Sequence, residues 1–245
     1  MPTRSKRVRA DRLLADSGLA ESREQAQVMI MEGLVFTASE RVLKASSLYP
    51  SGTAFDVKGR LRFVGRGGLK LAHALDTFEI DVDEFAALDV GASTGGFTDC
   101  MLQRGAARVY ALDVGHGQLD YRLRTNPRVS VMEKVNARNP FEIPEPVDIA
   151  TIDVSFISLT LVLPEVMRHL KEDGHVLALV KPQFEAPRED VGRGGVIKDP
   201  KVHAHVLSRI INWAVDQKIR LRDICPSPIL GDAGNREFFV DLQKP

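Results

Sequence analysis

The segment from Leu88 to Cys100, LDVGASTGGFTDC, constrains the fold of this chain more than any other. An apolar run leads into a glycine-rich turn that contains Gly91, Gly95 and Gly96, and a helix-forming stretch follows at once. A strand that passes through such a turn into a helix brings backbone N–H groups and the helix N-terminus close to a nucleotide-like ligand. The segment therefore predicts the first strand, turn and helix of a nucleotide-binding α/β domain.

The acidic residues beside this turn narrow the choice of ligand without fixing it. Asp113 ends the next apolar run, VYALDV, where a carboxylate can accept hydrogen bonds from ribose hydroxyls. A dinucleotide fits poorly, because Ser93 replaces the second glycine of the G-x-G-x-x-G fingerprint. Asp89, just before the turn, suits the amino-acid end of S-adenosylmethionine better than a pyrophosphate. Methyl-donor binding is the favoured hypothesis, and a dinucleotide or a turn without a ligand are the alternatives.

From residue 69 onward the chain alternates apolar strand-like runs with helical patterns. The predicted strands are 86–91, 108–113, 129–132, 147–153, 174–181, 220–227 and 236–242, and the predicted helices are 69–78, 96–104, 160–171 and 200–217. Such alternation is typical of a mainly parallel sheet with helices on both faces. We therefore expect a doubly wound, seven-stranded, Rossmann-like methyltransferase sheet of the α/β class. The last two strands should pair as a closing hairpin that adds an antiparallel edge strand.

Residues 1–57 have the pattern of a separate small α+β module. A first helix is expected at about 9–17, and Ser22 with Gln25 three positions later forms a capping box for a second. Gly33 should end that helix, and short strands should follow at 34–37 and 53–57. A basic, glycine-rich linker, KGRLRFVGRGG, spans residues 58–68 and precedes the α/β domain at 69–245.

Charge is distributed unevenly although the net charge is zero. Residues 1–70 hold 13 Lys/Arg and 7 Asp/Glu, a net of +6, whereas residues 71–245 hold 20 and 26, a net of −6. A basic N-terminal segment on an otherwise acidic protein suggests an anionic partner. Nucleic acid is the leading candidate, and an anionic membrane surface is the other.

Several other classes of site and location are disfavoured by the sequence. Cys100 and Cys225 lie far apart and the histidines lack metal-ligand spacing, so we expect reduced thiols and no metal site. No apolar run approaches the roughly 18 residues of a membrane-spanning helix. The basic start of the chain lacks the apolar core of a secretory signal. A cytoplasmic protein is the expectation.

Charged residues at the predicted strand ends are the candidates for chemistry. In open α/β sheets the ligand lies beyond the carboxyl ends of the strands. Asp153 and Lys181 end two central strands there, Glu237 opens the final one, and Lys70 begins the helix before the first. Any one of these charges is as well explained by a surface ion pair. Four that converge on one rim predict an active site.

The N-terminal module resembles the S4 RNA-binding domain. The matching residues are R-x-D-R-L-L at 9–14 and GLAESREQAQVMIMEGLV at 18–35, while Ala38-Ser39 replaces the usual asparagine-glycine turn. The resemblance implies that arginines of this module face structured RNA, which is recognised largely by shape and phosphate contacts. The candidate RNA-binding residues are Arg7, Arg9, Arg12, Arg23 and Arg66.

The remainder resembles the FtsJ-like 2′-O-methyltransferases, and more closely the TlyA family, whose members carry the names of haemolysins and of ribosomal RNA (cytidine-2′-O)-methyltransferases. The matching phrases are RGGLKL (66–71), DVGASTGGFTDC (89–100), DVSFISL (153–159), VKPQFE (180–185), GGVIKDP (194–200) and GNREFF (234–239). The resemblance implies S-adenosylmethionine as cofactor. It also implies methylation of a ribose 2′-hydroxyl, with cytidine as the expected nucleotide, in ribosomal RNA or a ribosomal subunit.

The resemblance also implies roles for particular residues. Lys70, Asp153, Lys181 and Glu237 match the family's Lys-Asp-Lys-Glu tetrad in order, and Lys181 is the expected central residue. The candidate cofactor-binding residues are Asp89, Gly91, Ser93, Thr94, Gly95, Gly96, Phe97, Asp113, Asn136 and Asp153. The polar, glycine-rich segment 185–199 is predicted to be a mobile loop over the active site that orders when RNA binds.

Two other functions are weighed against methyl transfer. A membrane-lytic protein, as the haemolysin name suggests, is disfavoured because the sequence has neither a membrane span nor a long amphipathic apolar helix. A non-catalytic ribosome-binding or assembly factor remains the main alternative, although an intact tetrad and cofactor loop count against it.

Overall fold

The computed structural model describes residues 7–38, 40–192, 194–231 and 234–244. The chain divides into two compact units between Arg66 and Gly67. The second unit begins with a helix at Gly67, two residues before the start that the sequence predicts at residue 69.

The N-terminal unit combines two helices with five short strands. These elements are α1 (Ala10–Asp16), α2 (Arg23–Met31), β1 (Arg7–Arg9), β2 (Val35–Thr37), β3 (Glu40–Arg41), β4 (Leu48–Pro50) and β5 (Asp56–Val57). β1 pairs with β4, and β2 lies between β3 and β5, in antiparallel pairs throughout. Leu14, Ile30, Val35 and Val42 are buried between helices and strands and form the core of this unit.

At the start of α2, one of the two hydrogen bonds of the predicted capping box is confirmed. Ser22 Oγ accepts a hydrogen bond from the Gln25 N–H at 3.1 Å, while Gln25 Oε1 accepts one from the N–H of Glu21 rather than of Ser22. Ala38 has a φ of +46°, and Ser39 of the predicted variant turn lies outside the described residues.

The second unit contains a seven-stranded sheet. Its strands are β6 (Ala86–Val90), β7 (Arg108–Asp113), β8 (Val129–Glu133), β9 (Val147–Ile152), β10 (Leu170–Val180), β11 (Arg220–Pro226) and β12 (Phe238–Gln243). Their order is β11-β12-β10-β9-β6-β7-β8, with parallel pairing from β10 to β8. This confirms the predicted fold. Within the closing hairpin, β12 lies between β10 and β11 and is antiparallel to both, and β11 forms the edge of the sheet.

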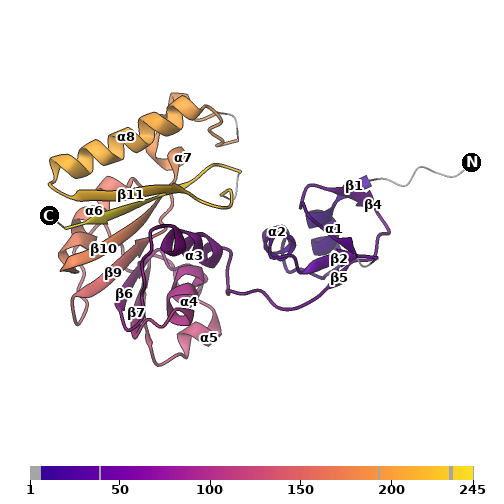
Figure 1. The fold of residues 1–245 in the computed structure, drawn as a ribbon, viewed down its shortest axis with the longest axis horizontal. Coiled ribbons are helices and arrows are strands. Elements are labelled where there is room, and N and C mark those ends of the chain that lie inside the picture. The colour runs from indigo at the N-terminus through magenta and orange to yellow at the C-terminus, as the bar shows by residue number, and fades with distance from the viewer. Residues whose placement is uncertain (1–6, 39, 193, 232–233, 245) are drawn as a thin grey trace, which may run out of the picture. The chain divides into compact units, whose positions relative to one another are not determined.

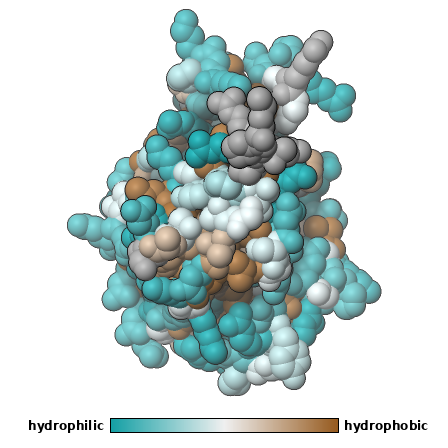
Figure 2. Space-filling model, turned by 90° about the vertical axis from the view of Figure 1, so that its right-hand side faces the viewer, coloured by the Kyte–Doolittle hydropathy of each residue, from teal (hydrophilic) through white to brown (hydrophobic). Residues whose placement is uncertain are grey.

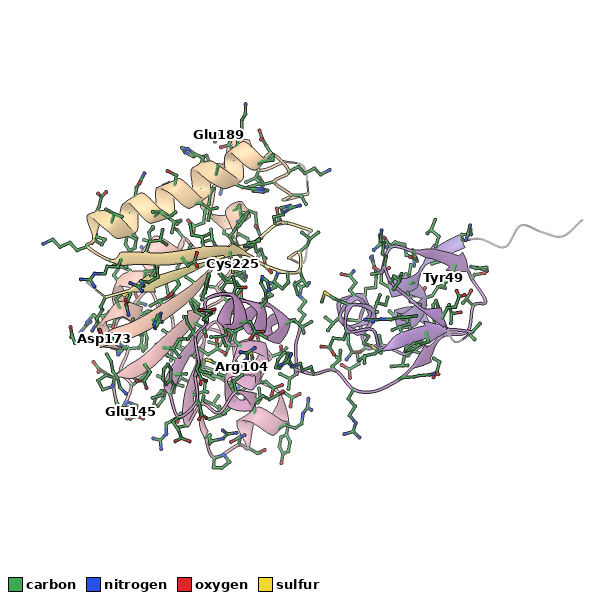
Figure 3. All side chains as sticks on the ribbon, in the orientation of Figure 1. Tyr49, Arg104, Glu145, Asp173, Glu189 and Cys225 are labelled. Carbon is green, nitrogen blue, oxygen red and sulfur yellow. The ribbon has the colours of Figure 1, made fainter. Side chains whose placement is uncertain are left out.

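Helices cover both faces of this sheet. They are α3 (Gly67–Thr77), α4 (Gly96–Gln103), α5 (Tyr121–Arg124), α6 (Leu163–Arg168), α7 (Pro182–Glu185) and α8 (Pro200–Asp216), with 3₁₀ turns η1 (Leu159–Leu161) and η2 (Arg188–Asp190). Figure 1 shows α3, α4 and α5 on one side of the sheet and α6, α7 and α8 on the other. The described side chains fill the space between these layers (Figure 3). Leu88, Ile152 and Val180, on three neighbouring strands, are completely buried in that core.

One predicted helix, 160–171, was wrong in extent. The chain forms the turn η1 and then the short helix α6, which has Pro164 in its first turn. β10 already begins at Leu170, because a register shift between Leu170 and His175 lets the strand continue beyond the predicted start at 174.

In the face that Figure 2 shows, hydrophilic residues cover most of the area and apolar residues occupy smaller areas between them. Among the described residues, no helix has the length and apolarity needed to cross a membrane. The described residues also contain no group of three or more His, Cys, Asp or Glu side chains that could hold a metal ion.

Candidate active site

The glycine turn at the end of β6 is too tight for side chains at two positions. Gly91 has a φ of +87°, and a Cβ there would lie 2.5 Å from the carbonyl oxygen of Asp153. Gly95 has a φ of +98°, and its Cβ would lie 2.2 Å from a methyl carbon of Leu123. Glycine is therefore required at both positions. The close approach at Gly91 joins the glycine turn directly to the strand end that carries Asp153.

Asp113 lies beside this turn, at the end of β7. Its Oδ2 accepts a hydrogen bond from the Ser93 N–H at 2.7 Å, and its Oδ1 accepts one from the Gly115 N–H at 2.6 Å. The side chain remains partly accessible. A nucleoside placed over the turn would thus find a carboxylate in the position expected for a ribose contact.

Asp89 has a different role from the one predicted. Its side chain is completely buried, and its two oxygens accept hydrogen bonds from Thr98 Oγ1 at 2.6 Å and Thr151 Oγ1 at 3.1 Å. Burial raises the pKa of this carboxyl to about 6, although the two threonine hydroxyls act in the opposite direction. Direct contact with a cofactor does not fit this burial. Asp89 instead fastens β6 to α4 and β9 behind the turn.

The other predicted cofactor residues are distributed around the turn. Thr94 is exposed, and its carbonyl oxygen accepts a hydrogen bond from the Asp120 N–H at 3.1 Å. Phe97 is buried and packs its ring 5.9 Å from that of Phe239, so its contribution is to the core. Asn136 is exposed, and its neighbour Val135 donates its N–H to the carbonyl oxygen of Asp113. The buried Gly96 begins α4.

The four tetrad residues form two ion pairs. Lys181 Nζ lies 2.6 Å from Asp153 Oδ1, and Lys70 Nζ lies 2.6 Å from Glu237 Oε2. The Lys181 and Asp153 side chains are 12% and 21% exposed, whereas those of Lys70 and Glu237 are 4% and 3% exposed. One pair therefore remains open to a ligand and the other is sealed in the protein.

α3, which carries Lys70, is held against α4 at its far end. Arg104 (labelled in Figure 3) caps α4 and donates hydrogen bonds to the Ala72 carbonyl oxygen at 3.2 Å and to Asp76 Oδ1 at 2.6 Å. The helix α4, which follows the glycine turn, is in this way fixed to α3, the helix that carries Lys70.

A pocket of about 320 Å³ opens at the tetrad. It is lined by Ser155, Phe156, Lys181, Gln183, Phe184, Val191, Gly195, Asn235 and Glu237. Lys181 Nζ donates a hydrogen bond to Ser155 Oγ at 3.0 Å, which orients the amine within the pocket. Because Lys181 and Glu237 line the same pocket, both ion pairs lie at one site.

Two aromatic residues at this pocket were not predicted. Phe156 is 89% exposed, has a φ of +63°, and packs against Phe184 with ring centroids 4.7 Å apart and the ring planes tilted by 47°. Lys181 Nζ lies 6.0 Å from the Phe184 ring. A bulky residue in a left-handed conformation carries backbone strain, and such residues cluster at functional sites. The sequence contains one signal that could have indicated them: Phe156 follows Asp153 by three positions, and Phe184 follows Lys181 by three.

Two of the N-terminal arginines, Arg9 and Arg23, contact the buried carboxylate of Asp11. Arg9 donates two hydrogen bonds to Asp11, at 2.9 and 2.7 Å, and Arg23 and Gln27 donate to Asp11 Oδ2 at 3.3 and 2.9 Å. Burial would raise the pKa of Asp11, but these donors outweigh it and lower the pKa to about 2. Arg9 and Arg23 stay 43% and 50% exposed, so Asp11 fixes them while part of each guanidinium faces solvent.

The other predicted RNA-binding residues are less constrained. Arg7 donates a hydrogen bond to the Leu48 carbonyl oxygen at 3.1 Å, and Arg12 Nε lies 3.5 Å from Asp16 Oδ2 in an exposed pair. Arg66 is partly exposed and ends the first unit.

Comparison with known proteins decides the family. The FtsJ-like methyltransferase family matches residues 63–244, and the S4 domain matches residues 8–53. The 16S/23S rRNA (cytidine-2′-O)-methyltransferase TlyA of Mycobacterium tuberculosis is 41% identical over 98% of this chain and 91% of its own. The chain belongs to the FtsJ-like methyltransferases and, among them, to the TlyA family.

Two further comparisons extend this result. YqxC of Bacillus subtilis is 46% identical over 98% of this chain and 87% of its own. A solved structure from Streptococcus thermophilus, of a protein named as a hemolysin, has a TM-score of 0.74 and 45% identity over 97% of this chain and 88% of its own. The combination of both units in one chain is thus shared with its relatives.

Proposed function

We propose that this TlyA-family protein transfers a methyl group from S-adenosylmethionine to a ribose 2′-hydroxyl of ribosomal RNA, with cytidine as the target. The observation that carries the proposal is the open Lys181–Asp153 pair: Lys181 lines the pocket, and the backbone of Asp153 approaches Gly91 of the glycine turn. The relative from Mycobacterium tuberculosis is named for this same reaction on 16S and 23S rRNA. We expect the enzyme to act in the cytoplasm, where ribosomal subunits are found.

The residues around the turn fit S-adenosylmethionine. The bare backbone at Gly91 and Gly95, the exposed Ser93 and Thr94, and the carboxylate of Asp113 would hold its polar parts. When bound, this cofactor supplies an electrophilic methyl on a positively charged sulfur. Asp153, whose backbone touches Gly91, joins the cofactor turn to the acceptor pocket.

Lys181 is the residue that acts on the acceptor. A 2′-hydroxyl in the pocket would hydrogen-bond to Nζ, which Asp153 and Ser155 hold in place. Lys181, after releasing its own proton to solvent, would accept the hydroxyl proton while the methyl group moves from sulfur to oxygen. Asp153 then stabilises the ammonium group that results. Orientation of the weak hydroxyl nucleophile supplies a further part of the rate.

Each unit has a separate task in this proposal. Residues 1–57 act as the RNA-binding domain, residues 58–68 as a linker, and residues 69–245 as the methyltransferase domain. Arg7, Arg9, Arg12, Arg23 and Arg66 bind RNA phosphates, a sequence-independent contact that weakens with salt. The packed aromatic pair Phe156–Phe184 offers a surface for the base of the target nucleotide, since an aromatic face can stack on any base.

The test is transfer of labelled methyl from S-adenosylmethionine to purified ribosomal subunits that lack the modification. A 2′-O-methyl group makes the adjacent linkage resistant to alkali, which maps the position. Lys181→Ala should abolish transfer while cofactor and RNA binding persist, and Lys171→Ala, which changes an exposed lysine, should keep it. Unchanged methylation by Lys181→Ala would refute the assignment. No transfer by a wild-type protein that binds both ligands would favour a non-catalytic ribosome-binding factor.

A further inference from the structure

One wall of the acceptor pocket is formed by a loop that a buried amide side chain contacts at two points. The strap, defined here as residues 194–197, contributes Gly195 to the pocket. Asn235, only 1% exposed, donates a hydrogen bond from Nδ2 to the Gly195 carbonyl oxygen at 2.8 Å. Its Oδ1 accepts one from the Ile197 N–H at 2.9 Å. Both halves of this amide are therefore used to hold the strap.

At its glycine end the backbone of the strap makes a turn hydrogen bond, which the Gly195 N–H donates to the Gly192 carbonyl oxygen at 3.0 Å. Gly194 and Gly195 have φ values of +83° and +74°, and a Cβ at either would meet nothing within 4 Å. The other end is fixed more firmly, because Ile197 is buried and its carbonyl oxygen lies 3.2 Å from His203 Nε2 on α8. The glycine end, which borders the pocket, is held by this turn and by Asn235.

Asn235 also lies next to the tetrad in the sequence. It precedes Glu237 by two residues, and both side chains line the acceptor pocket together with Gly195. The carbonyl oxygen of Asn235 accepts a hydrogen bond from the Gly231 N–H at 2.9 Å, and a Cβ on Gly231 would lie 2.2 Å from Glu237 Oε1. The turn that presents Glu237 is consequently the same turn that holds the strap.

We propose that Asn235 is a positioning residue that keeps the strap closed against the acceptor pocket and so aligns the target nucleotide with Lys181. The proposal rests on the proposed function and extends it to one determinant of acceptor binding. Asparagine suits the role because its amide both donates and accepts. Aspartate has nearly the same shape but only accepts when ionised, and it would face the Gly195 carbonyl oxygen with a negative charge.

The experiment compares Asn235→Asp and Asn235→Ala with wild type, and uses Asn212→Asp as the matched control. Asn212 is exposed on α8 and makes only a 3.4 Å hydrogen bond to Ser208 Oγ among the described contacts, so the control introduces the same charge without releasing the strap. Three quantities are measured: the KM for unmodified ribosomal subunits, the Kd for S-adenosylmethionine, and the rate of tryptic cleavage within residues 188–198.

Both Asn235 variants should raise the KM about tenfold or more, roughly the loss of one buried hydrogen bond, and leave the cofactor Kd within about twofold. Cleavage of the strap segment should become faster, since local opening exposes the backbone. An unchanged KM and cleavage rate would overturn the proposal. Loss of cofactor binding in both variants would also overturn it, because Asn235 would then be a general folding contact. If wild type methylates no subunit, the proposed function fails, whereas the cleavage rates still test the strap.

Discussion

Lys70 and Glu237 lie 167 positions apart in the sequence, yet Lys70 Nζ and Glu237 Oε2 are 2.6 Å apart and both side chains are almost fully buried. The pair joins α3, which begins the second unit, to the turn that precedes β12. A buried ion pair gains little net stability when both partners are present, because each charge has lost its water. The sealed pair and the open Lys181–Asp153 pair meet at one pocket, which Glu237 and Lys181 both line.

Breaking this buried pair should destabilise the protein strongly. Lys70→Met leaves Glu237 as a buried charge without its partner, which typically costs about 3–5 kcal/mol in the free energy of unfolding. Lys171→Met is the matched control, because Lys171 forms a 2.7 Å pair with Asp148 but is 51% exposed. That variant should lose less than about 1 kcal/mol. Urea denaturation measures both, and equal losses would contradict the assigned difference in burial.

The sequence predicted the fold and the meeting of the four tetrad residues, because both follow from local patterns. Apolar runs marked the strands, and the carboxyl ends of parallel strands meet at one edge, so Asp153 and Lys181 could be placed together. Which tetrad lysine pairs with which carboxylate could not be predicted. That depends on how α3 and the final hairpin approach the sheet, which no local pattern records.

Other features escaped the sequence for related reasons. The strand β1 has three residues and β3 has two, too few for an alternating pattern to be recognised. Asp89 was expected to face the cofactor because it ends a strand, but its side chain lies on the inner side, where Thr98 and Thr151 donate to it. The exposure of Phe156 runs against its hydrophobicity, so only the folded structure reveals it.

Gly91→Ala should weaken cofactor binding by at least about tenfold. The new methyl would lie 2.5 Å from the carbonyl oxygen of Asp153, so the turn and the strand end must separate. Gly117→Ala is the control: its φ of +71° gives a comparable backbone strain, but nothing lies within 4 Å of the added Cβ. Calorimetric titration with S-adenosylmethionine compares them. Similar affinities for the two variants would show that strain, not the contact with Asp153, governs the site.

Phe156→Ala should reduce acceptor use while leaving the fold intact. The side chain is 89% exposed, so its removal should change the free energy of unfolding by less than about 0.5 kcal/mol. Loss of base stacking is worth about 1–3 kcal/mol, which predicts a fall in kcat/KM for ribosomal subunits of roughly 5- to 150-fold. Phe156→Tyr keeps the aromatic face and should retain most of the activity. Wild-type kcat/KM in the alanine variant would exclude a stacking role.

The raised pKa of Asp89 predicts a specific dependence of stability on pH. Its pKa is about 6 in the folded protein against an ordinary value of 3.8, so between these values the folded protein holds a proton that the unfolded chain has released. The contribution of Asp89 to the free energy of unfolding is therefore highest below about pH 4, falls as the pH rises to about 6, and is constant above that. The total decrease is about 3 kcal/mol.

Asp89→Asn does not titrate, so the difference in unfolding free energy between wild type and this variant should decline by that amount from pH 4 to pH 7. Asp173→Asn, at an exposed acid, should keep the wild-type profile. If Asp89→Asn and wild type ran parallel over this window, the buried carboxyl would not be titrating there, and its hydrogen bonds from Thr98 and Thr151 would have to offset the whole cost of burial.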